Sequence, residues 1–458
     1  MIEIEFNVGS PGKPDCPCRV CGSRDAAAAL TVSSEDAKRR LFHCNTCDSF
    51  YFDGIDPVIG YEGGISDAFW LDYVQAGAGI TTMLAPLTAM DPLPSGDLID
   101  VGCGFGFIVD YWSANHGKAV GLESSYYGEV GRQKLGIDIR PQHLDAFRKT
   151  EPGRTFAIVY SSEVIEHTPD PEAFMDDLVM MLENNSILVL TTPSATAISP
   201  AIGRAKLLAA LSPGFHYAIL SEKIMRQMLE RRGLHFQIET ADGQMIVWAS
   251  RAPLPAIKYG ATDWLSYFAF LERLSLNGDP HLALGALVRL FKDALNTSHP
   301  DIAADAWDRL LPRAKEVYGI DLLHPEINDL MMIRTPLAEL ARFPSWLGNA
   351  LLFGGLHIGH RNNDRRGKVR MLDAALAVMH RRADVDLQFG QEAQSFLPFA
   401  ERQYVIALSE ALTASLPPIG SVVEPALRGS LKALRKVIGM RLGGKLNKKR
   451  KKGWWWLR

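Results

Sequence analysis

The run Leu98-Ile-Asp-Val-Gly-Cys-Gly-Phe-Gly106 constrains the fold of this chain more than any other segment. An apolar strand passes directly into alternating glycines and then into the helical stretch Phe107–Ala114. Glycine is needed where the backbone turns sharply and approaches a ligand without a Cβ in the way, and the first N–H groups of the helix that follows are unpaired. The order of strand, tight turn and helix therefore predicts a ligand that rests on the backbone at the end of a parallel strand.

Short apolar, β-branched runs alternate with helical stretches around this segment. The predicted strands are Leu98–Val101, Ala119–Leu122, Ile137–Arg140, Phe156–Ser161 and Ile187–Thr192. The alternation predicts an α/β fold with a parallel sheet covered by helices on both faces. After the helix Glu222–Arg232, the strands Leu234–Thr240 and Met245–Ser250 flank an Asp-Gly turn. They predict an antiparallel hairpin that closes the sheet.

Two acidic residues end neighbouring strands beside the glycines. Asp100 lies in the strand before the G-x-G-x-G run, where a carboxylate would repel a pyrophosphate but hold an ammonium group. Glu123 ends the next strand, where an acidic side chain can accept hydrogen bonds from both ribose hydroxyls. The two residues predict a nucleoside ligand with a positively charged end. The alternative is a plain glycine turn with a surface carboxylate.

These motifs resemble those of the class I S-adenosylmethionine-dependent methyltransferases. The family's first motif is matched by Asp100, Gly102, Gly104 and Gly106, and its acidic second motif by Glu123. The segment Phe156–Pro171, with its Glu-His-x-x-Asp-Pro ending, looks like the fourth strand of the family and the loop after it. The resemblance covers about residues 60–250. It implies a Rossmann-like seven-stranded sheet, S-adenosylmethionine as cofactor, and an in-line methyl transfer in which the protein mainly positions a nucleophile.

Three further residues are candidates for contact with the cofactor or the substrate. Glu163, in the loop after the fourth strand, is a candidate for contact with the methionine end of the cofactor or with the substrate. His167 in the same loop and His216 in Pro213-Gly-Phe-His-Tyr217 are candidate general bases, because histidine titrates near neutral pH. Each histidine could instead bond a backbone carbonyl or cap a helix.

The sequence departs from the family pattern at two places. Gln142-His143 stands where many members have Gly-Asp near the adenine, and Phe156-Ala157 stands where they have Phe-Asp. The adenine contacts are therefore less defined than the ribose contact. These departures leave room for a second hypothesis, a scaffold protein that binds the cofactor without turnover, whereas the intact first motif and Glu123 favour an enzyme.

Five of the six cysteines lie in the first 47 residues, in a segment with too few apolar residues to form a core unaided. Two C-x-x-C pairs about 20 residues apart have the spacing of a zinc ribbon. Because four thiolates make a closed tetrahedral site, we expect a structural zinc ion bound by Cys18, Cys21, Cys44 and Cys47. Cys16 could replace Cys18 as a ligand, and disulfides are the alternative in an oxidising compartment.

The ribbon also suggests a substrate class. Bacterial methyltransferases of sugars and surface-glycan precursors carry a similar N-terminal ribbon followed by an aromatic run, here Phe50-Tyr-Phe52. This resemblance implies a sugar or lipid-linked glycan precursor as acceptor, in polysaccharide biosynthesis. Sugar C-methyltransferases have a second α/β domain in the C-terminal half, whereas this chain has helical patterns there.

We expect four parts: a zinc ribbon (residues 1–55), a methyltransferase domain (56–250), an all-α domain (251–428) and a basic, Trp-rich tail (429–458). Period-3.6 apolar spacing predicts the helices Trp264–Leu274, His281–Leu295, Ile302–Val317, Arg370–His380 and Glu392–Leu412. They predict an irregular bundle or stacked helical hairpins of the tetratricopeptide kind, either of which could recruit a protein partner.

The C-terminal tail differs in charge from the rest of the chain. Residues 429–458 contain eleven Lys or Arg and no Asp or Glu, so the net charge of −3 leaves −14 on the remainder. Basic residues beside Trp454-Trp-Trp456 predict binding to an anionic membrane surface. Single-stranded nucleic acid, as in an RNA methyltransferase, and a solubilising tail are the alternatives, and the acidic remainder counts against RNA.

Two absences in the sequence bear on location. No run approaches the roughly 20 apolar residues that span a bilayer. Met1-Ile-Glu-Ile-Glu lacks the basic and apolar pattern of a signal peptide. We therefore expect a cytoplasmic protein whose tail contacts the inner face of the membrane.

Overall fold

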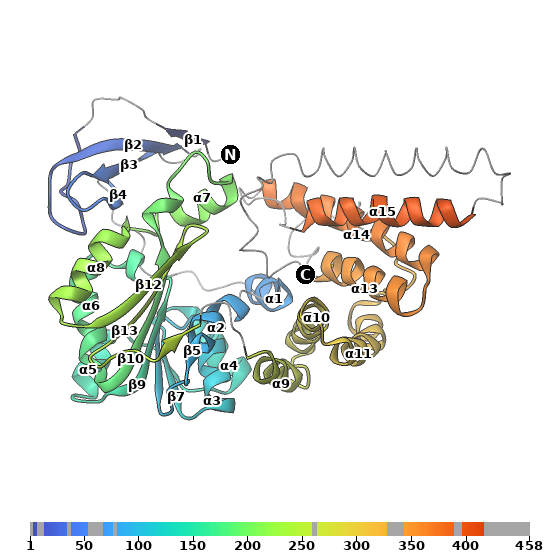
Figure 1. The fold of residues 1–458 in the computed structure, drawn as a ribbon, viewed down its shortest axis with the longest axis horizontal. Coiled ribbons are helices and arrows are strands. Elements are labelled where there is room, and N and C mark those ends of the chain that lie inside the picture. The colour runs from blue at the N-terminus through green and yellow to red at the C-terminus, as the bar shows by residue number, and fades with distance from the viewer. Residues whose placement is uncertain are drawn as a thin grey trace. The chain divides into compact units, whose positions relative to one another are not determined.

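A seven-stranded sheet organises the first of two compact units in the computed structural model of this chain (Figure 1). The structure describes residues 3–6, 13–33, 38–53, 67–76, 80–258, 263–327, 343–388 and 396–415. Within these residues, the first unit falls in 1–65 and 79–264, and the second in 66–78 and 265–458. The predicted basic tail, residues 429–458, lies outside the described part of the chain.

The strands of this sheet run in the order β12-β13-β10-β9-β6-β7-β8. Their bounds are β6 (Leu98–Val101), β7 (Ala119–Leu122), β8 (Ile139–Arg140), β9 (Phe156–Ser162), β10 (Leu182–Pro193), β12 (His235–Ala241) and β13 (Gln244–Ser250). Neighbours from β8 to β10 pair in parallel, and β13 pairs antiparallel with both β10 and β12. The predicted fold class and its closing hairpin are confirmed.

Helices cover both faces of the sheet (Figure 1). On one face are α2 (Ile80–Thr88), α3 (Phe107–Asn115) and α4 (Tyr126–Leu135), and on the other are α5 (Leu144–Thr150), α6 (Pro171–Met180) and α8 (Glu222–Arg231). With both faces covered, the central strands are apolar and buried along their length, as in Ile99, Val159 and Leu188. The order of connections reverses at β6, which leaves a crevice at the carboxyl ends of the strands.

A second sheet contains the cysteine segment. Its strands are β1 (Glu3–Phe6), β2 (Ala26–Ser33), β3 (Lys38–Cys44), β4 (Phe50–Phe52) and β11 (Ala218–Ile219), in that order. The edge strand β11 lies far from the other four strands in the sequence, and it pairs antiparallel with β4. The side chains of Cys18, Phe42 and Tyr51 belong to one buried cluster with residues of the large sheet. The ribbon and the large sheet therefore share a core.

Short elements complete the first unit. They are β5 (Met90–Asp91), paired with β14 (Ala256–Ile257), the 3-10 turns η1 (Ile165–His167) and η2 (Ala195–Ala197), and α7 (Arg204–Leu211). Of these, η1 matters for function, since it follows β9 directly and carries the Glu-His pair predicted after the fourth strand.

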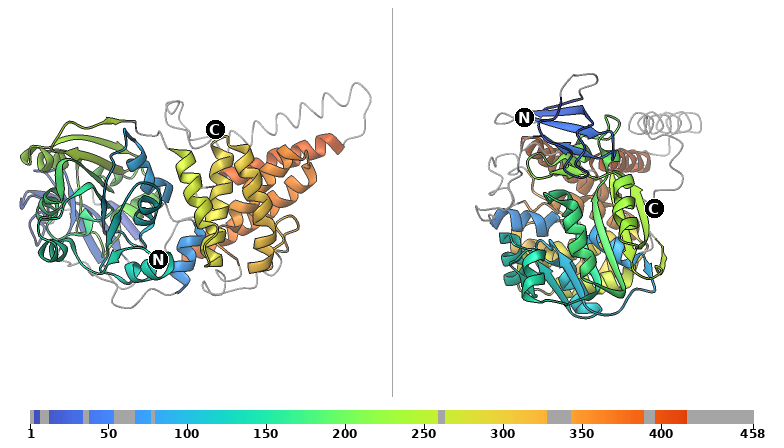
Figure 2. Two further views of the ribbon diagram at one scale, coloured as in Figure 1. Left: turned by 90° about the horizontal axis from the view of Figure 1, so that it is seen from below. Right: turned by 90° about the vertical axis from the view of Figure 1, so that its left-hand side faces the viewer.

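The second unit is helical (Figure 2). Its described helices are α1 (Asp67–Ala76), α9 (Trp264–Leu274), α10 (Pro280–Asn296), α11 (Pro300–Tyr318), α13 (Leu347–Arg361), α14 (Arg365–Gln388) and α15 (Leu397–Ser415). Helices that follow one another pack together, as α10 with α11 and α13 with α14. The contact between α1 and α10 is close, because a Cβ on Gly285 would lie 2.1 Å from the carbonyl oxygen of Val74. Among the described residues, no helix combines the length and apolar character that a membrane span requires.

Candidate functional site

The glycine turn after β6 has the backbone conformation that its sequence predicts. Gly102, Gly104 and Gly106 have φ angles of 75°, 54° and 81°, which residues with a Cβ adopt at a cost. A Cβ on Gly102 would also lie 2.4 Å from a methyl carbon of Val164, in the loop after β9. The turn can therefore pack against that loop only because it is glycine, and Gly106 then begins α3 as its N-cap.

The carboxylate of Glu123 is held at the end of β7 by two backbone donors. Its Oε2 accepts a hydrogen bond from Gly104 N at 3.0 Å, and its Oε1 accepts one from Ser125 N at 2.9 Å. These bonds tie the acidic residue to the glycine turn and fix the direction of its remaining lone pairs. A carboxylate held in this way can accept hydrogen bonds from the two hydroxyls of a ribose.

Asp100 is a buried carboxyl beside this turn, with 3% of its surface exposed. Burial, and secondarily the negative charge of Glu123, raise the pKa of Asp100 well above its usual value. A positively charged ligand would reverse this effect, since an opposite charge favours the ionised carboxylate.

A cavity of about 650 Å³ opens at the carboxyl ends of these strands, within the range of about 300–1,000 Å³ typical of small-molecule sites. Of the predicted site residues, Gly102, Glu123, Glu163 and His167 line it. Asp100, Gly104, Gly106 and His216 are not among the described residues of its wall. The departure Gln142-His143 does lie in the wall, where the family pattern has its adenine contacts.

Several wall residues were not predicted from the sequence, among them the aromatic side chains of Tyr127, Phe174 and Phe215. Tyr127 packs edge-on against Phe105 of the glycine turn, with ring centroids 5.0 Å apart. Flat apolar rings of this kind suit a nucleobase or the body of an acceptor.

Two glycines of α4 were also missed. A Cβ on Gly131 would lie 2.2 Å from the carbonyl oxygen of Phe105, and one on Gly128 would lie 2.8 Å from the Cβ of Glu123. They allow α4 to approach both binding motifs. Their spacing of three residues on a predicted helix is the sequence signal that could have identified them.

The loop after β9 places two glutamates close together. Glu163, whose φ of 58° is unusual for a residue with a side chain, lines the cavity and accepts a hydrogen bond from Thr191 Oγ1 at 2.9 Å. Glu166 has none of its surface exposed, and its Oε2 accepts a hydrogen bond from Thr192 Oγ1 at 2.9 Å. Burial, and then the charge of Glu163, raise the pKa of Glu166.

Both candidate histidines face Glu166. His167 Nδ1 lies 3.1 Å from Phe215 O, and His216 Nδ1 lies 2.8 Å from Ala210 O. Burial lowers the pKa of both rings, in His216 to about 3. Both rings thus make the bonds to backbone carbonyls that are the alternative to a role as general base. Each Nε2 is directed toward Glu166, and its distance from Oε1 is 4.0 Å in His167 and 3.9 Å in His216.

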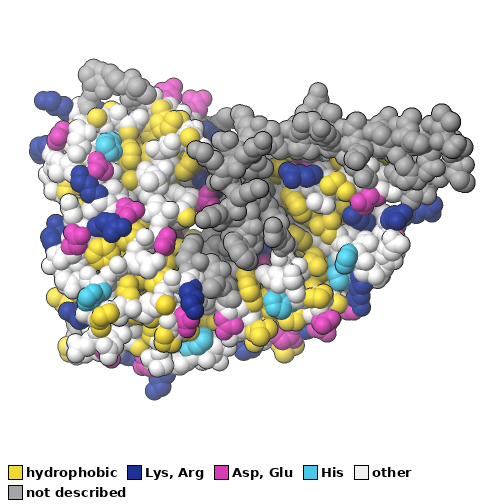
Figure 3. Space-filling model, viewed as in Figure 1, with side chains coloured by type: hydrophobic (Ala, Val, Ile, Leu, Met, Phe, Trp, Pro, Cys, Tyr) yellow, Lys and Arg dark blue, Asp and Glu magenta, His cyan; other side chains and the backbone are white. Residues whose placement is uncertain are grey.

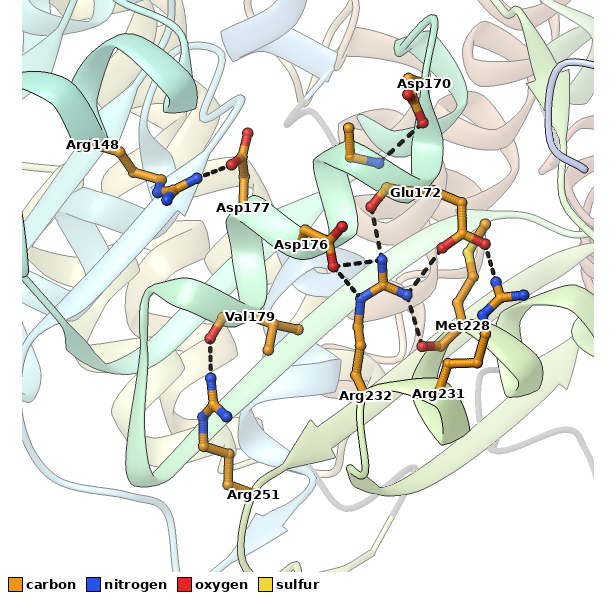
Figure 4. A network of polar contacts seen from close by, with 11 residues as sticks. Arg148, Asp170, Glu172, Asp176, Asp177, Val179, Met228, Arg231, Arg232 and Arg251 are labelled. Carbon is orange, nitrogen blue, oxygen red and sulfur yellow. Dashed lines mark hydrogen bonds and ion pairs between the residues drawn. The ribbon is translucent and has the colours of Figure 1, made fainter.

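The helix after this loop is fixed to its neighbours by a network of ionic contacts (Figure 4). Arg232, at the end of α8, binds the carboxylates of Glu172 and Asp176 on α6 at 3.0 and 2.7 Å. On the same helix Asp177, which lines the cavity, pairs with Arg148 of α5. Asp170 caps α6 by accepting from Ala173 N at 3.0 Å. The network holds the part of α6 that forms the cavity wall.

The cysteine cluster assembles as its spacing predicts. The sulfurs of Cys18, Cys21, Cys44 and Cys47 all lie within 4.8 Å of one another, with 3.7 Å between Cys18 and Cys47 and 3.6 Å between Cys21 and Cys44. Sulfurs about 2.3 Å from one zinc ion at tetrahedral angles would lie about 3.8 Å apart. The donor set and its spacing fit zinc, and all six cysteines are free of disulfides.

Sequence comparison agrees with this geometry. Residues 78–237 match the family model described as a methyltransferase domain. That range contains the parallel strands, the glycine turn, Glu123 and the loop after β9. The first unit of this chain therefore contains a class I S-adenosylmethionine-dependent methyltransferase domain.

Curated relatives are similar over part of their length. The ubiquinone biosynthesis O-methyltransferase of Parvibaculum lavamentivorans is 28% identical over 137 residues, which cover 28% of this chain and 53% of that protein. The enzyme of the same name from Xanthomonas campestris pv. campestris is 26% identical over 190 residues, or 37% of this chain and 79% of that protein. The chain spans only about half the length of the first of these relatives.

Solved structures are similar at lower identity. An O-methyltransferase family protein from Burkholderia thailandensis matches with a TM-score of 0.34 and 11% identity, over 41% of this chain and 61% of that one. The plantazolicin methyltransferase BpumL, in complex with a monoazolic desmethylPZN analog and SAH, matches with a TM-score of 0.32 and 13% identity, over 40% of this chain and 87% of that one.

Proposed function

We propose that this chain is an S-adenosylmethionine-dependent methyltransferase whose acceptor is a sugar or a lipid-linked glycan precursor. The observation that carries the activity is the cavity at the carboxyl ends of the strands, with Glu123 fixed in its wall by Gly104 N and Ser125 N. The acceptor class rests on the N-terminal ribbon, which resembles that of sugar and glycan methyltransferases.

In this proposal the residues of the chain mainly bind and orient. S-adenosylmethionine, when bound, supplies a methyl group already activated on a sulfonium. Glu123 holds the ribose, and Asp100 balances the positive charge beside the glycine turn. The acceptor oxygen attacks the methyl carbon while the carbon–sulfur bond breaks and its electron pair passes to sulfur, and the hydroxyl proton leaves to a base or to water. Placing the two reactants in line supplies most of the acceleration.

His167 is the stronger of the two candidates for receiving that proton, because it lines the cavity. Its ring donates to Phe215 O through Nδ1, so Nε2 is the atom that can accept. His216, with its pKa lowered to about 3, is a weak base near neutral pH, and we assign it to positioning instead.

A second acceptor class is a phenolic hydroxyl of a quinol precursor, since the curated relatives are named ubiquinone biosynthesis O-methyltransferases. RNA is a weaker candidate. On the face of the first unit in Figure 3, acidic and basic side chains are interspersed, whereas a phosphate-binding surface would gather basic ones. A cofactor-binding scaffold without turnover is the remaining alternative.

The other parts have supporting roles in this proposal. The cysteine cluster binds a structural zinc ion, and the predicted all-α domain (251–428) binds the acceptor or a protein partner. The basic tail (429–458) brings the cytoplasmic enzyme to an anionic membrane surface where lipid-linked precursors lie. Retention of the full chain on anionic but not neutral vesicles, with loss of retention when the tail lysines are replaced by glutamine, would support the membrane role.

The activity is tested by incubating the purified chain with S-adenosylmethionine labelled in the methyl group and with separate pools of sugar nucleotides, lipid-linked glycans, polyprenylated phenols and RNA. Transfer of label to a glycan pool is the expected result. Transfer to the phenols would replace the acceptor class and keep the activity. Cofactor binding without transfer to any pool would favour the scaffold.

A further inference from the structure

Three ligand atoms converge beside the cavity. Glu166, His167 and His216 each offer one ligand atom within 4.8 Å of the other two, and the Nε2 atoms of His167 and His216 lie 4.0 and 3.9 Å from Glu166 Oε1. Glu166 and His167 come from the turn after β9, whereas His216 comes from the segment between α7 and β11. Two distant parts of the sequence thus bring two imidazoles and one carboxylate to one point.

The tautomers of the two histidines are set by the backbone. A carbonyl oxygen only accepts, so the bonds to Phe215 O and Ala210 O require that each Nδ1 carries the proton. Each Nε2 then presents a lone pair to Glu166. Metal-binding histidines commonly have this arrangement, in which a hydrogen bond from the second nitrogen fixes the ring and its tautomer.

The carboxylate between the rings is incompletely satisfied. Glu166 is fully buried, and its Oε1 has no hydrogen-bond partner among the described residues. At 3.9 and 4.0 Å, the nitrogens of His216 and His167 are too far from Oε1 for hydrogen bonds. A buried acceptor without a partner is costly and calls for an explanation such as an ion at the site.

We propose that Glu166, His167 and His216 bind a divalent transition-metal ion. Two imidazole nitrogens with one carboxylate suit Mn²⁺, Fe²⁺, Co²⁺ or Zn²⁺ better than Mg²⁺ or Ca²⁺, which prefer oxygen ligands throughout. Ligand atoms about 2.1 Å from one ion at the tetrahedral angle lie about 3.4 Å apart. Movements of a few tenths of an ångström by each side chain would bring each Nε2 to that distance from Glu166 Oε1.

The position of the site suggests what the ion does. Three protein ligands leave coordination positions open, and His167 and Glu163 both line the cavity. This step rests on the proposed methyl transfer. The ion would bind the acceptor oxygen directly and lower the pKa of its hydroxyl, and the released proton would pass to water, because Nε2 of His167 would then be a ligand of the ion and not the general base. This assigns an oxygen acceptor rather than a carbon acceptor to the cavity.

The test is a titration of the zinc-loaded full-length chain with Mn²⁺, following the electron paramagnetic resonance signal of free Mn²⁺. Manganese is chosen because the thiolate cluster favours softer ions. We expect about one tight equivalent in the wild type, and at least about tenfold weaker binding in Glu166→Gln and His216→Gln. Glu166→Gln keeps the shape of the side chain and an oxygen for Thr192. The matched control is His235→Gln, at an exposed position of β12.

Each outcome bears on the inference. No binding by the wild type at millimolar Mn²⁺, or equal binding by all four proteins, overturns it. Thermal unfolding without added metal checks that the variants fold, and Mn²⁺ should raise the melting temperature of the wild type and His235→Gln only. Because binding is measured without acceptor or cofactor, a bound ion in a chain that transfers no methyl group would leave the metal site standing and remove the proposed function.

Discussion

Replacing Glu123 tests whether the cavity binds the nucleoside part of the cofactor. If Glu123 binds the ribose as proposed, Glu123→Ala removes the acceptor for its two hydroxyls. The substitution also removes the carboxylate that accepts hydrogen bonds from Gly104 N and Ser125 N at 3.0 and 2.9 Å. The backbone of the turn carries the remaining contacts. We therefore expect weaker cofactor binding with an intact fold.

The size of the effect follows from the number of bonds. A hydrogen bond to a charged group contributes about 1.5–3 kcal/mol, so two ribose bonds correspond to about 3 kcal/mol at the lower limit. That loss weakens binding by about 150-fold. The cofactor affinity of Glu123→Gln should lie between those of the wild type and Glu123→Ala, because the amide oxygen can still accept a hydrogen bond while the NH₂ group faces a backbone donor.

The assay is calorimetric titration of each protein with S-adenosylmethionine and with S-adenosylhomocysteine. The matched control is Glu129→Ala, since Glu129 is exposed on α4 and bonds only Gln133 among the contacts described for its side chain. The control should bind as the wild type does. A Glu123→Ala dissociation constant within twofold of that of the wild type would refute the assignment of Glu123 to the ribose.

Three further predictions follow from the site and its supports. Asp100→Asn should stabilise the ligand-free chain in urea at neutral pH and weaken cofactor binding. Because the pKa of Asp100 is raised in the folded state, the stability of the wild type should fall as the pH rises above the unfolded pKa of about 4. The variant should lack this fall. Cys44→Ser should lose bound zinc and melt at lower temperature, whereas Cys16→Ser should keep its zinc by metal analysis; loss in both would revise the ligand set. Arg232→Ala should cost about 2 kcal/mol in urea unfolding, because Asp176 loses its partner and Glu172 keeps only Arg231. The exposed helical pair broken in Arg226→Ala should cost about 0.5 kcal/mol, and equal costs would contradict a role for the network.

Much of the large sheet was predictable because its strands have a strong local signal. Buried apolar runs ending in glycine or an acidic residue identified β6 and β7 with their observed bounds. The first half of β10 was missed, since Glu183-Asn-Asn-Ser186 is polar and resembles a loop, and the register shifts between Leu182 and Ile187. The β-propensities of the residues do not predict a strand whose conformation is set by pairing with a neighbouring strand.

The residues of the candidate site were likewise predictable only in part. Glu123 and the glycines could be predicted because their chemistry depends on sequence-local geometry, a strand followed by a turn. Tyr127 and Phe174 could not, because their place in the wall depends on how α4 and α6 are rotated against the sheet. The meeting of His216 with Glu166 depends on a long-range contact, for which a single sequence holds no signal.

The pairing of β4 with β11 has a consequence for how the chain responds to metal. Tyr217 N donates to Glu166 O at 2.8 Å, and Phe52 N donates to Tyr217 O at 3.3 Å. One residue therefore connects the ribbon to the turn that carries Glu166 and to the segment of His216 and Phe215, and Phe215 lines the cavity wall. Binding that stabilises the ribbon therefore also restricts the motion of these segments beside the cavity. Zinc at the cysteines and a ligand in the cavity should therefore strengthen each other's binding by the same factor, as thermodynamic linkage requires, and zinc depletion would reach the reaction centre through this strand.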